Sequence, residues 1–256
     1  MENEPLMTVF VTGATSGFGK AIAERLVHEG HRVIAAGRRK ERLDALHHHL
    51  GEHCLPFPLD MRDKGALRAL PSSLPESWRN IDVLINNAGL ALGMTPAQDA
   101  NVDEWETMIS TNISGMVEIT RALLPSMVSR NKGYIISLGS TAGTYPYKGG
   151  NIYGATKAFV KQFMQNLRTD LLGTPIRVTN IEPGLCGGSE FSQIRLKNAQ
   201  QAEAVYQGTE PLLPEDIAET VSWLLSLPPR MNVNRIEIMP VCQASGGLAV
   251  HRGPLE

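Results

Sequence analysis

The chain alternates short apolar runs with longer segments of helical periodicity, and this alternation restricts its fold more than any other feature. The first of these runs, at residues 8–11, is apolar and rich in β-branched residues, which is typical of a buried parallel strand. Strands that alternate with helices predict a doubly wound α/β fold, in which helices cover both sides of a parallel sheet. About seven strands are predicted, at residues 8–11, 32–36, 54–59, 81–85, 134–138, 176–181 and 233–239.

The predicted helices have identifiable ends. They span residues 20–29, 39–50, 105–130, 153–172 and 214–227. Gly30 is a natural stop for the first helix, and Pro125 is expected to kink or break the third. Pro56 and Pro58 place the strand that contains them at an edge of the sheet, or shorten it. No repeat or low-complexity linker separates these elements, so we expect residues 1–256 to form a single domain.

The composition excludes several classes of partner. A net charge of −2 gives no general attraction to nucleic acid. No stretch approaches the roughly 18 apolar residues of a membrane span, and the acidic residues 1–5 lack the features of a signal peptide.

Three scattered cysteines, Cys54, Cys186 and Cys242, are expected to be reduced thiols of a cytoplasmic protein. The consecutive histidines 47–49 point in different directions on a helix, so we expect no metal site there.

A glycine-rich turn follows the first predicted strand and precedes the first helix. Its spacing is Gly-x-x-x-Gly-x-Gly, at Gly13, Gly17 and Gly19. Such a turn lets backbone N–H groups approach a pyrophosphate, and the helix N-terminus adds positive potential. We therefore predict a Rossmann-type dinucleotide site, against the alternative of a plain βα turn. The cofactor contacts expected here are Gly13, Thr15, Ser16, Gly17 and Phe18.

The end of the second strand indicates which dinucleotide binds. Sites for NAD usually have an Asp or Glu there, which accepts hydrogen bonds from ribose hydroxyls. This chain has Gly37-Arg38-Arg39 instead. Arg38 and Arg39 can hold a 2′-phosphate that a carboxylate would repel, so NADP(H) is the predicted cofactor. The alternative is a pair of solvated arginines at a helix start, a position that the helix dipole disfavours.

A serine, a tyrosine and a lysine point to the chemistry. Tyr153 and Lys157 are four positions apart, on one face of a helix, and Ser140 follows the fifth strand. A neighbouring ammonium favours the phenolate and is expected to lower the tyrosine pKa from about 10. A serine hydroxyl can hold a carbonyl oxygen while the tyrosine moves the proton. The trio predicts interconversion of a carbonyl and an alcohol, although the same spacing also occurs on a solvated helix face.

Together these motifs resemble the short-chain dehydrogenase/reductase family, in order and in spacing over nearly the whole chain. The matching positions outside the glycine turn are Asp60, Asn86-Asn87-Ala88-Gly89, Asn112, Ser140, Tyr153-x-x-x-Lys157 and Pro183-Gly184. The resemblance implies that Asp60 contacts the adenine, and that Asn87, Ala88, Gly89, Pro183, Gly184 and Leu185 line the cofactor. It also implies a catalytic tetrad of Asn112, Ser140, Tyr153 and Lys157. In that tetrad Lys157 binds the nicotinamide ribose and Asn112 holds a water of a proton relay.

One branch of the family is more similar still. Residues 87–94, 139–143 and 181–185 resemble bacterial NADP-dependent 3-hydroxy acid dehydrogenases. This implies a substrate such as malonic semialdehyde, serine or L-allo-threonine, and a homotetramer in which the helices at 105–130 and 153–172 form an interface. Sulfoacetaldehyde reductases are similar to the same branch and provide an alternative substrate. An alternative of another class is a regulator that binds NADP without catalysis.

The chain departs from the family pattern after Pro183-Gly184. Many members have a threonine that contacts the nicotinamide carboxamide, and Ser189 is the candidate replacement here. A substrate lid is expected at about residues 185–210. Within it, Arg195 is the candidate clamp for an anionic substrate, because arginine grips carboxylate or sulfonate oxygens with paired hydrogen bonds. Tyr147 and Lys148 are lesser candidates, and a solvated lid arginine is the alternative.

Overall fold

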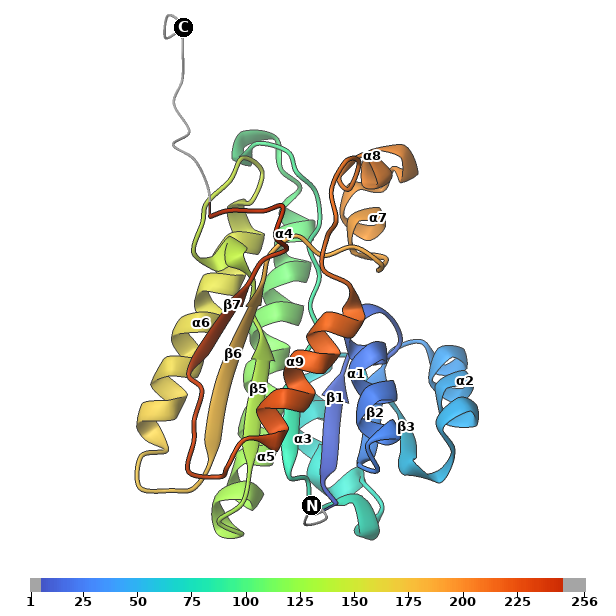
Figure 1. Ribbon diagram of the computed structural model, residues 1–256, viewed down its shortest axis with the longest axis vertical. Helices are drawn as coiled ribbons and strands as arrows, with labels where there is room; N and C mark the ends of the chain where they lie inside the picture. Colours follow the sequence, from blue (N-terminus) through green and yellow to red (C-terminus); the bar gives the residue numbers. More distant parts are fainter. Residues whose placement is uncertain (1–5, 246–256) are drawn as a thin grey trace, which may run out of the picture.

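A seven-stranded parallel sheet forms the centre of the described structure, with strand order β3-β2-β1-β4-β5-β6-β7 (Figure 1). This computed structural model describes residues 6–245; residues 1–5, including the acidic N-terminus, and 246–256 lie outside it. The doubly wound parallel sheet predicted from the sequence is confirmed. The strands are β1 (Thr8–Thr12), β2 (Arg32–Gly37), β3 (Cys54–Pro58), β4 (Val83–Asn86), β5 (Tyr134–Leu138), β6 (Arg177–Pro183) and β7 (Arg235–Ile238).

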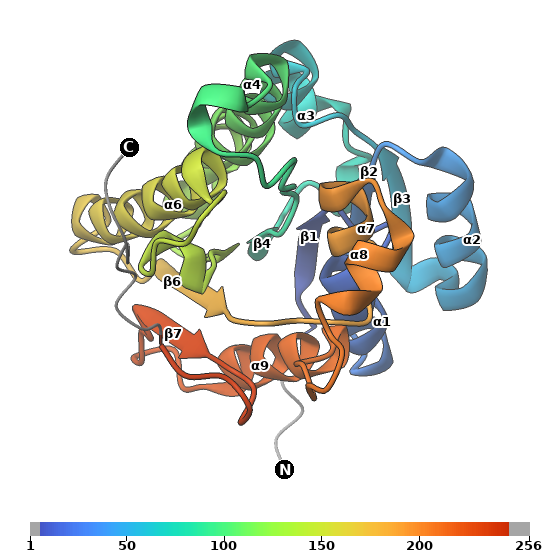
Figure 2. The same ribbon diagram turned by 90° about the horizontal axis from the view of Figure 1, so that it is seen from above.

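Helices bury both faces of the sheet, as the view from above shows (Figure 2). One face carries α1 (Gly17–His28), α2 (Lys40–Leu50) and α9 (Pro214–Ser226); the other carries α3 (Lys64–Ser73), α5 (Met116–Ser129) and α6 (Asn151–Asp170). Within β1, Val9 and Val11 pack in the first of these two clusters and Phe10 in the second. Burial on both sides explains why β1 is apolar at consecutive positions.

The observed helices differ from the predicted ones at α3 and around residue 110, and two short helices between residues 191 and 204 were not predicted either. Helix α3 was not predicted: it carries Pro71, although Leu67 and Leu70 are buried and the Asp63 carboxylate caps its first turn. The helix predicted at 105–130 is divided at Ser110–Gly115, a π-helical segment between α4 (Val102–Ile109) and α5. Pro125, where the break was expected, lies inside α5. The predicted edge position of β3 is confirmed.

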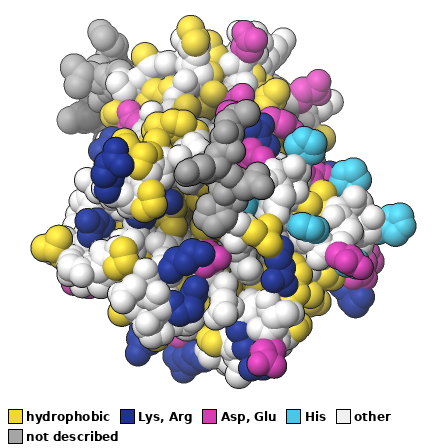
Figure 3. Space-filling view, turned by 60° about the horizontal axis from the view of Figure 1, so that its bottom comes forward, with side chains coloured by type: hydrophobic (Ala, Val, Ile, Leu, Met, Phe, Trp, Pro, Cys, Tyr) yellow, Lys and Arg dark blue, Asp and Glu magenta, His cyan; other side chains and the backbone are white. Residues whose placement is uncertain are grey.

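Two short helices lie over the end of the sheet at which the strands finish. They are α7 (Phe191–Leu196) and α8 (Ala199–Ala204), and both fall within the expected lid (Figures 1 and 2). None of the helices in residues 6–245 is long and apolar enough to cross a membrane. On the face shown in Figure 3, the Lys and Arg side chains are scattered among other side chains.

Candidate active site

A cavity of about 800 Å³ opens where β1, β2, β4, β5 and β6 end. It lies beside the point at which the strand order reverses between β1 and β4, where doubly wound sheets bind their ligands. Of the catalytic, cofactor and substrate residues predicted from the sequence, every one lines this cavity except Asn112 and the lesser candidate Lys148. The structure therefore brings the glycine turn, the arginine pair, the Ser140–Tyr153–Lys157 group and Arg195 into one space.

The glycine turn is pressed against the segment that follows β4. Gly13 has a φ of +70°, and a Cβ atom placed on it would lie 3.0 Å from the Ala88 Cα. The Thr12 hydroxyl accepts hydrogen bonds from the backbone N–H groups of Asn87, at 3.0 Å, and Ala88, at 2.9 Å. It also donates to the Ile85 carbonyl, at 3.2 Å. This close backbone approach fits a bound pyrophosphate, and Thr12 is a residue that sequence reasoning missed.

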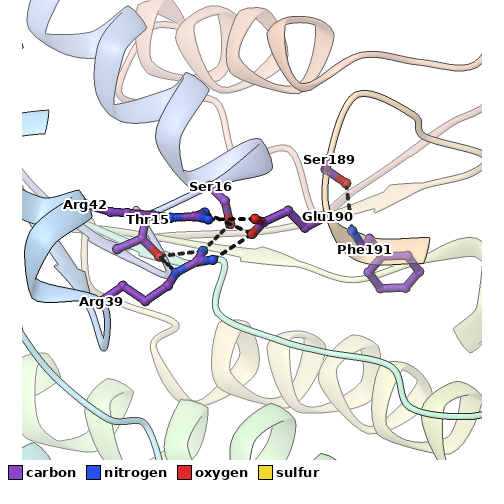
Figure 4. A network of polar contacts seen from close by, with 7 residues as sticks. All are labelled: Thr15, Ser16, Arg39, Arg42, Ser189, Glu190 and Phe191. Atoms are coloured by element: carbon purple, nitrogen blue, oxygen red, sulfur yellow. Dashed lines mark hydrogen bonds and ion pairs between the residues drawn. The ribbon is translucent and has the colours of Figure 1, made fainter. Parts of the chain in front are cut away.

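The two arginines after β2 have different surroundings. The Arg39 guanidinium donates to the Thr15 hydroxyl at 3.1 and 2.9 Å, to the Ser16 hydroxyl at 2.7 Å and to the Glu190 carboxylate at 2.7 Å (Figure 4). Arg38 lines the cavity and makes no hydrogen bond or ion pair with any residue from 6 to 245. Arg38 thus presents a free cation to a cofactor phosphate, whereas Arg39 is already engaged.

Asp60, just beyond β3, lies on the same side of the cavity. Its carboxylate accepts hydrogen bonds from the Arg62 guanidinium, the shortest at 2.7 Å. These bonds, together with the charge of Arg38, hold the pKa of Asp60 below its usual value. Asp60 therefore stays an acceptor at the edge of the cavity, as a contact to a cofactor amino group would require.

The proposed proton-transfer residues are buried next to one another. Tyr153 and Lys157, on α6, are 8% and 7% exposed, and the Lys157 ammonium lies 5.9 Å from the centre of the Tyr153 ring. Burial raises the pKa of Tyr153 to about 12, against the opposing effect of its hydrogen bond with Ser140. Burial also lowers the pKa of Lys157 to about 8, and its ammonium donates to the Leu138 carbonyl at 2.7 Å. The expected lowering of the tyrosine pKa is absent here, because burial outweighs the neighbouring groups.

Asn112 lies behind the cavity wall. It belongs to the π-helical segment and is 2% exposed. Its side-chain amide accepts from the Leu90 N–H at 2.9 Å, and donates to the Leu90 carbonyl at 2.8 Å and the Thr156 hydroxyl at 3.1 Å. Thr156 in turn donates to the Tyr153 carbonyl at 2.8 Å. In this arrangement Asn112 fixes the segment around Leu90 to the helix that carries Tyr153.

The lid places a cation and a ring over Tyr153. The Arg195 guanidinium carbon lies 5.4 Å from the centre of the Tyr153 ring, and the Phe191 ring lies 5.8 Å from it. Arg195 also donates to the Tyr147 hydroxyl at 2.7 Å. Lys148, the other lesser candidate, is exposed and does not line the cavity. An anion held by Arg195 would therefore sit close to the reacting groups.

Two smaller side chains line the cavity where the chain departs from the family pattern. The Ser189 Cβ lies 3.1 Å from a Cβ atom placed on Gly17, so Ser189 is next to the glycine turn. Burial raises the pKa of Cys186 to about 12, which keeps its thiol protonated and unreactive. Within residues 6–245, no three His, Cys, Asp or Glu side chains are grouped to hold a metal ion.

Comparisons with known proteins agree with this geometry. The chain is 58% identical to an NADP-dependent 3-hydroxy acid dehydrogenase (YdfG) of Salmonella typhi, over 96% of this chain and 100% of that one. It is 47% identical to a serine 3-dehydrogenase of Rhizobium radiobacter, over 96% and 98% of the two chains. A solved closed form of serine dehydrogenase complexed with NADP⁺ has 57% identity and a TM-score of 0.95, covering 96% of this chain and all of that one.

A second solved structure, the serine dehydrogenase of Escherichia coli, has 53% identity and a TM-score of 0.83, covering 93% of this chain and all of the other. The profile of the short chain dehydrogenase family matches residues 7–199, which contain the glycine turn and the Ser140, Tyr153 and Lys157 positions. The chain belongs to the short chain dehydrogenase family.

Proposed function

We propose that the protein is an NADP(H)-dependent oxidoreductase that interconverts a short anionic aldehyde and its alcohol. The proposed substrates are 3-hydroxy acids and their aldehydes, such as 3-hydroxypropionate and malonic semialdehyde, serine and allo-threonine. One observation carries the proposal: a single cavity holds the buried Ser140–Tyr153–Lys157 group with Arg195 above it, and Arg38 beside the glycine turn. The names of the relatives, NADP-dependent 3-hydroxy acid dehydrogenase and serine 3-dehydrogenase, support it.

The residues around the bound cofactor would perform the following roles. The nicotinamide supplies the hydride in reduction and accepts it in oxidation. Ser140 donates a hydrogen bond to the substrate carbonyl oxygen, and Tyr153 transfers its proton to that oxygen as the carbonyl becomes an alcohol. With its pKa raised to about 12, Tyr153 holds this proton until the substrate is in place. The Lys157 ammonium then stabilises the phenolate that remains.

Arg195 is proposed to select the substrate. Its guanidinium is 5.4 Å from the Tyr153 ring centre, so the anion and the reacting carbonyl must be joined by a short linker. A carboxylate one carbon away from the aldehyde meets this requirement. Sulfoacetaldehyde is the second candidate, because Arg195 and the Tyr147 hydroxyl lie side by side and offer donors to a sulfonate from two directions.

Catalysis is favoured over a purely regulatory role by the burial of Lys157. An ammonium that is 7% exposed is costly to bury, and its one hydrogen bond within the described residues is to the Leu138 carbonyl. A protein that only sensed NADP would not need Tyr153 and Lys157 together. The arrangement is useful where a phenolate must form during turnover.

The remaining assignments are proposals of the same kind. Residues 185–210, with α7 and α8, would act as the substrate lid. A homotetramer is favoured by apolar side chains on the outside of the helices at 102–129 and 151–170, where Phe159 is 38% exposed and Val102 is 62% exposed. The three free cysteines suit a reducing compartment such as the cytoplasm.

The test compares two aldehydes with NADPH, followed by the loss of its absorbance. We expect a higher kcat/KM for malonic semialdehyde than for sulfoacetaldehyde. A higher value for sulfoacetaldehyde would assign the protein to sulfonate reduction. Binding of NADPH without turnover of either aldehyde, or of serine with NADP⁺, would contradict the proposed enzyme and favour the regulator.

A further inference from the structure

Glu190 connects the lid to the two arginines at the phosphate end of the cavity. It immediately precedes α7, and its carboxylate points towards α2 (Figure 4). One oxygen accepts from Arg39 at 2.7 Å and from Arg42 at 3.0 Å, and the other accepts from Arg42 at 2.8 Å. Both oxygens of one lid carboxylate are therefore held by residues about 150 positions earlier in the chain.

The C-terminal end of α7 is attached to a different part of the protein. The Lys197 ammonium pairs with the Glu104 carboxylate of α4 at 2.5 Å. The Arg195 carbonyl accepts a hydrogen bond from the Gly93 N–H at 3.0 Å. The segment from 190 to 197 thus spans the space between the start of α2 and the start of α4, with an attachment at each side.

The Glu190 contacts lie at the boundary of the cavity. Arg39 and Glu190 line the cavity, whereas Arg42 lines only an outer pocket on the other side of the same contacts. Arg39 therefore approaches the carboxylate from the cavity side and Arg42 from the solvent side. Thr15 and Ser16, in the glycine turn, hold the rest of the Arg39 guanidinium in place.

We propose that Glu190, Arg39 and Arg42 form a clasp that closes the lid over the bound dinucleotide and slows its release. The clasp rests on the proposed function, since it requires NADP(H) in the cavity. Hydrogen bonds from Arg42 and Arg39 lower the pKa of Glu190 to about 2, so its carboxylate stays charged at every working pH. The three side chains are 34–47% exposed, so their attraction is open to screening by salt.

The test measures NADPH dissociation from Glu190→Gln by stopped-flow fluorescence. The substitution keeps the shape of the side chain and removes its charge. Partly exposed ion pairs contribute up to about 1 kcal/mol each, so we expect the dissociation rate to rise about threefold to tenfold. NADH release should also accelerate, because Glu190 and Arg42 attach the lid whether or not the dinucleotide carries a 2′-phosphate.

Two further variants separate the clasp from general effects of charge. Arg42→Gln, whose side chain does not line the cavity, should accelerate release less than Glu190→Gln. The double variant should release NADPH no faster than Glu190→Gln alone, because both changes remove the same contacts. Asp44→Asn is the matched control: it removes a carboxylate from α2 whose ion pair is with Lys40, not with the lid. Its release rate should equal that of the wild type.

The outcomes are distinct. Failure of the wild type to bind NADPH would refute the proposed function and the clasp together, whereas the results that follow bear on the clasp alone. Wild-type or slower release from Glu190→Gln would overturn the clasp, and slower release would mean that Glu190 competes with the cofactor phosphate. Equal acceleration by Asp44→Asn would also overturn it. In about 0.5 M salt the difference between Glu190→Gln and the wild type should shrink, which a loss of packing would not produce.

Discussion

Replacement of Arg38 should remove most of the preference for NADP(H) over NAD(H). A guanidinium has five N–H donors, and Arg39 already directs its donors to Thr15, Ser16 and Glu190. Arg38 makes no hydrogen bond or ion pair to another residue of the described chain, so all of its donors are available. Each arginine neighbours the cavity, but only Arg38 can meet a phosphate without first giving up a partner.

The magnitude follows from the exposure of Arg38. A hydrogen bond to a charged group contributes about 1.5–3 kcal/mol, and the lower end applies because Arg38 is exposed to solvent. A loss of about 1.4 kcal/mol is tenfold in affinity. We therefore expect Arg38→Ala to lower kcat/KM for NADPH about tenfold and to leave kcat/KM for NADH within about twofold of the wild type.

The assay measures kcat/KM and Kd for both cofactors in the wild type, Arg38→Ala and Arg39→Ala. Arg39→Ala should reduce the NADPH/NADH ratio less than Arg38→Ala does, because its guanidinium mainly holds the glycine turn and the lid. A larger loss of discrimination in Arg39→Ala than in Arg38→Ala would refute this reasoning. So would an equal fall in kcat/KM for NADH and NADPH in Arg38→Ala.

Three further predictions concern the reacting end of the cavity. Tyr153→Phe should lower kcat by about 10²–10⁴-fold with little change in the Kd for NADPH, and near-wild-type turnover would exclude Tyr153 as the proton donor. Arg195→Ala should raise KM for malonic semialdehyde about tenfold but not KM for the neutral aldehyde propanal; a similar rise for both would exclude an anion clamp. Lys157→Met should have a larger free energy of unfolding than the wild type at pH 7. This difference should shrink as the pH rises from 8 to 10.5. In the wild type the folded lysine loses its proton near pH 8 and the unfolded one near 10.5, so over that range the unfolded state binds more protons and wild-type stability rises with pH. Urea unfolding of both proteins from pH 7 to 10.5 measures the difference in their free energies of unfolding. A difference that does not change with pH would contradict the lowered pKa of Lys157.

The sheet could be predicted from the sequence because its inner strands are buried on both faces and are largely apolar runs. The missed helix α3 shows the limit of such reasoning. Pro71 lies near its end, and the pattern of buried residues there is short. The π-helical segment at 110–115 was also missed, because a single π-turn shifts the spacing of apolar residues by only one position within a long helical pattern.

The candidate site was predicted as a set of positions but not as a set of contacts. Adjacent arginines are equivalent in a sequence, and only the fold brings Glu190 to Arg39 and leaves Arg38 with no hydrogen bond or ion pair to a side chain within residues 6–245. The spacing of Tyr153 and Lys157 predicts that they are neighbours, but it does not reveal how deeply they are buried. Burial is what raises the tyrosine pKa in the structure.

The hydrogen bonds of the Thr12 hydroxyl make the sheet side of the cavity more stable than the lid side. This hydroxyl bonds the Ile85 carbonyl within β4 and the N–H groups of Asn87 and Ala88 just beyond β4, so the cavity floor is an extension of the sheet's own hydrogen bonding. The lid is attached by one backbone hydrogen bond, from Gly93 to Arg195, and by side chains that are partly in solvent. The amide hydrogens of Asn87 and Ala88 should therefore exchange with solvent only when the sheet unfolds, and those of α7 much sooner. The segment after β4 thus opens only when the sheet unfolds, whereas the lid opens when a few surface contacts break. The cofactor can therefore be exchanged without disturbing the surface on which it is bound.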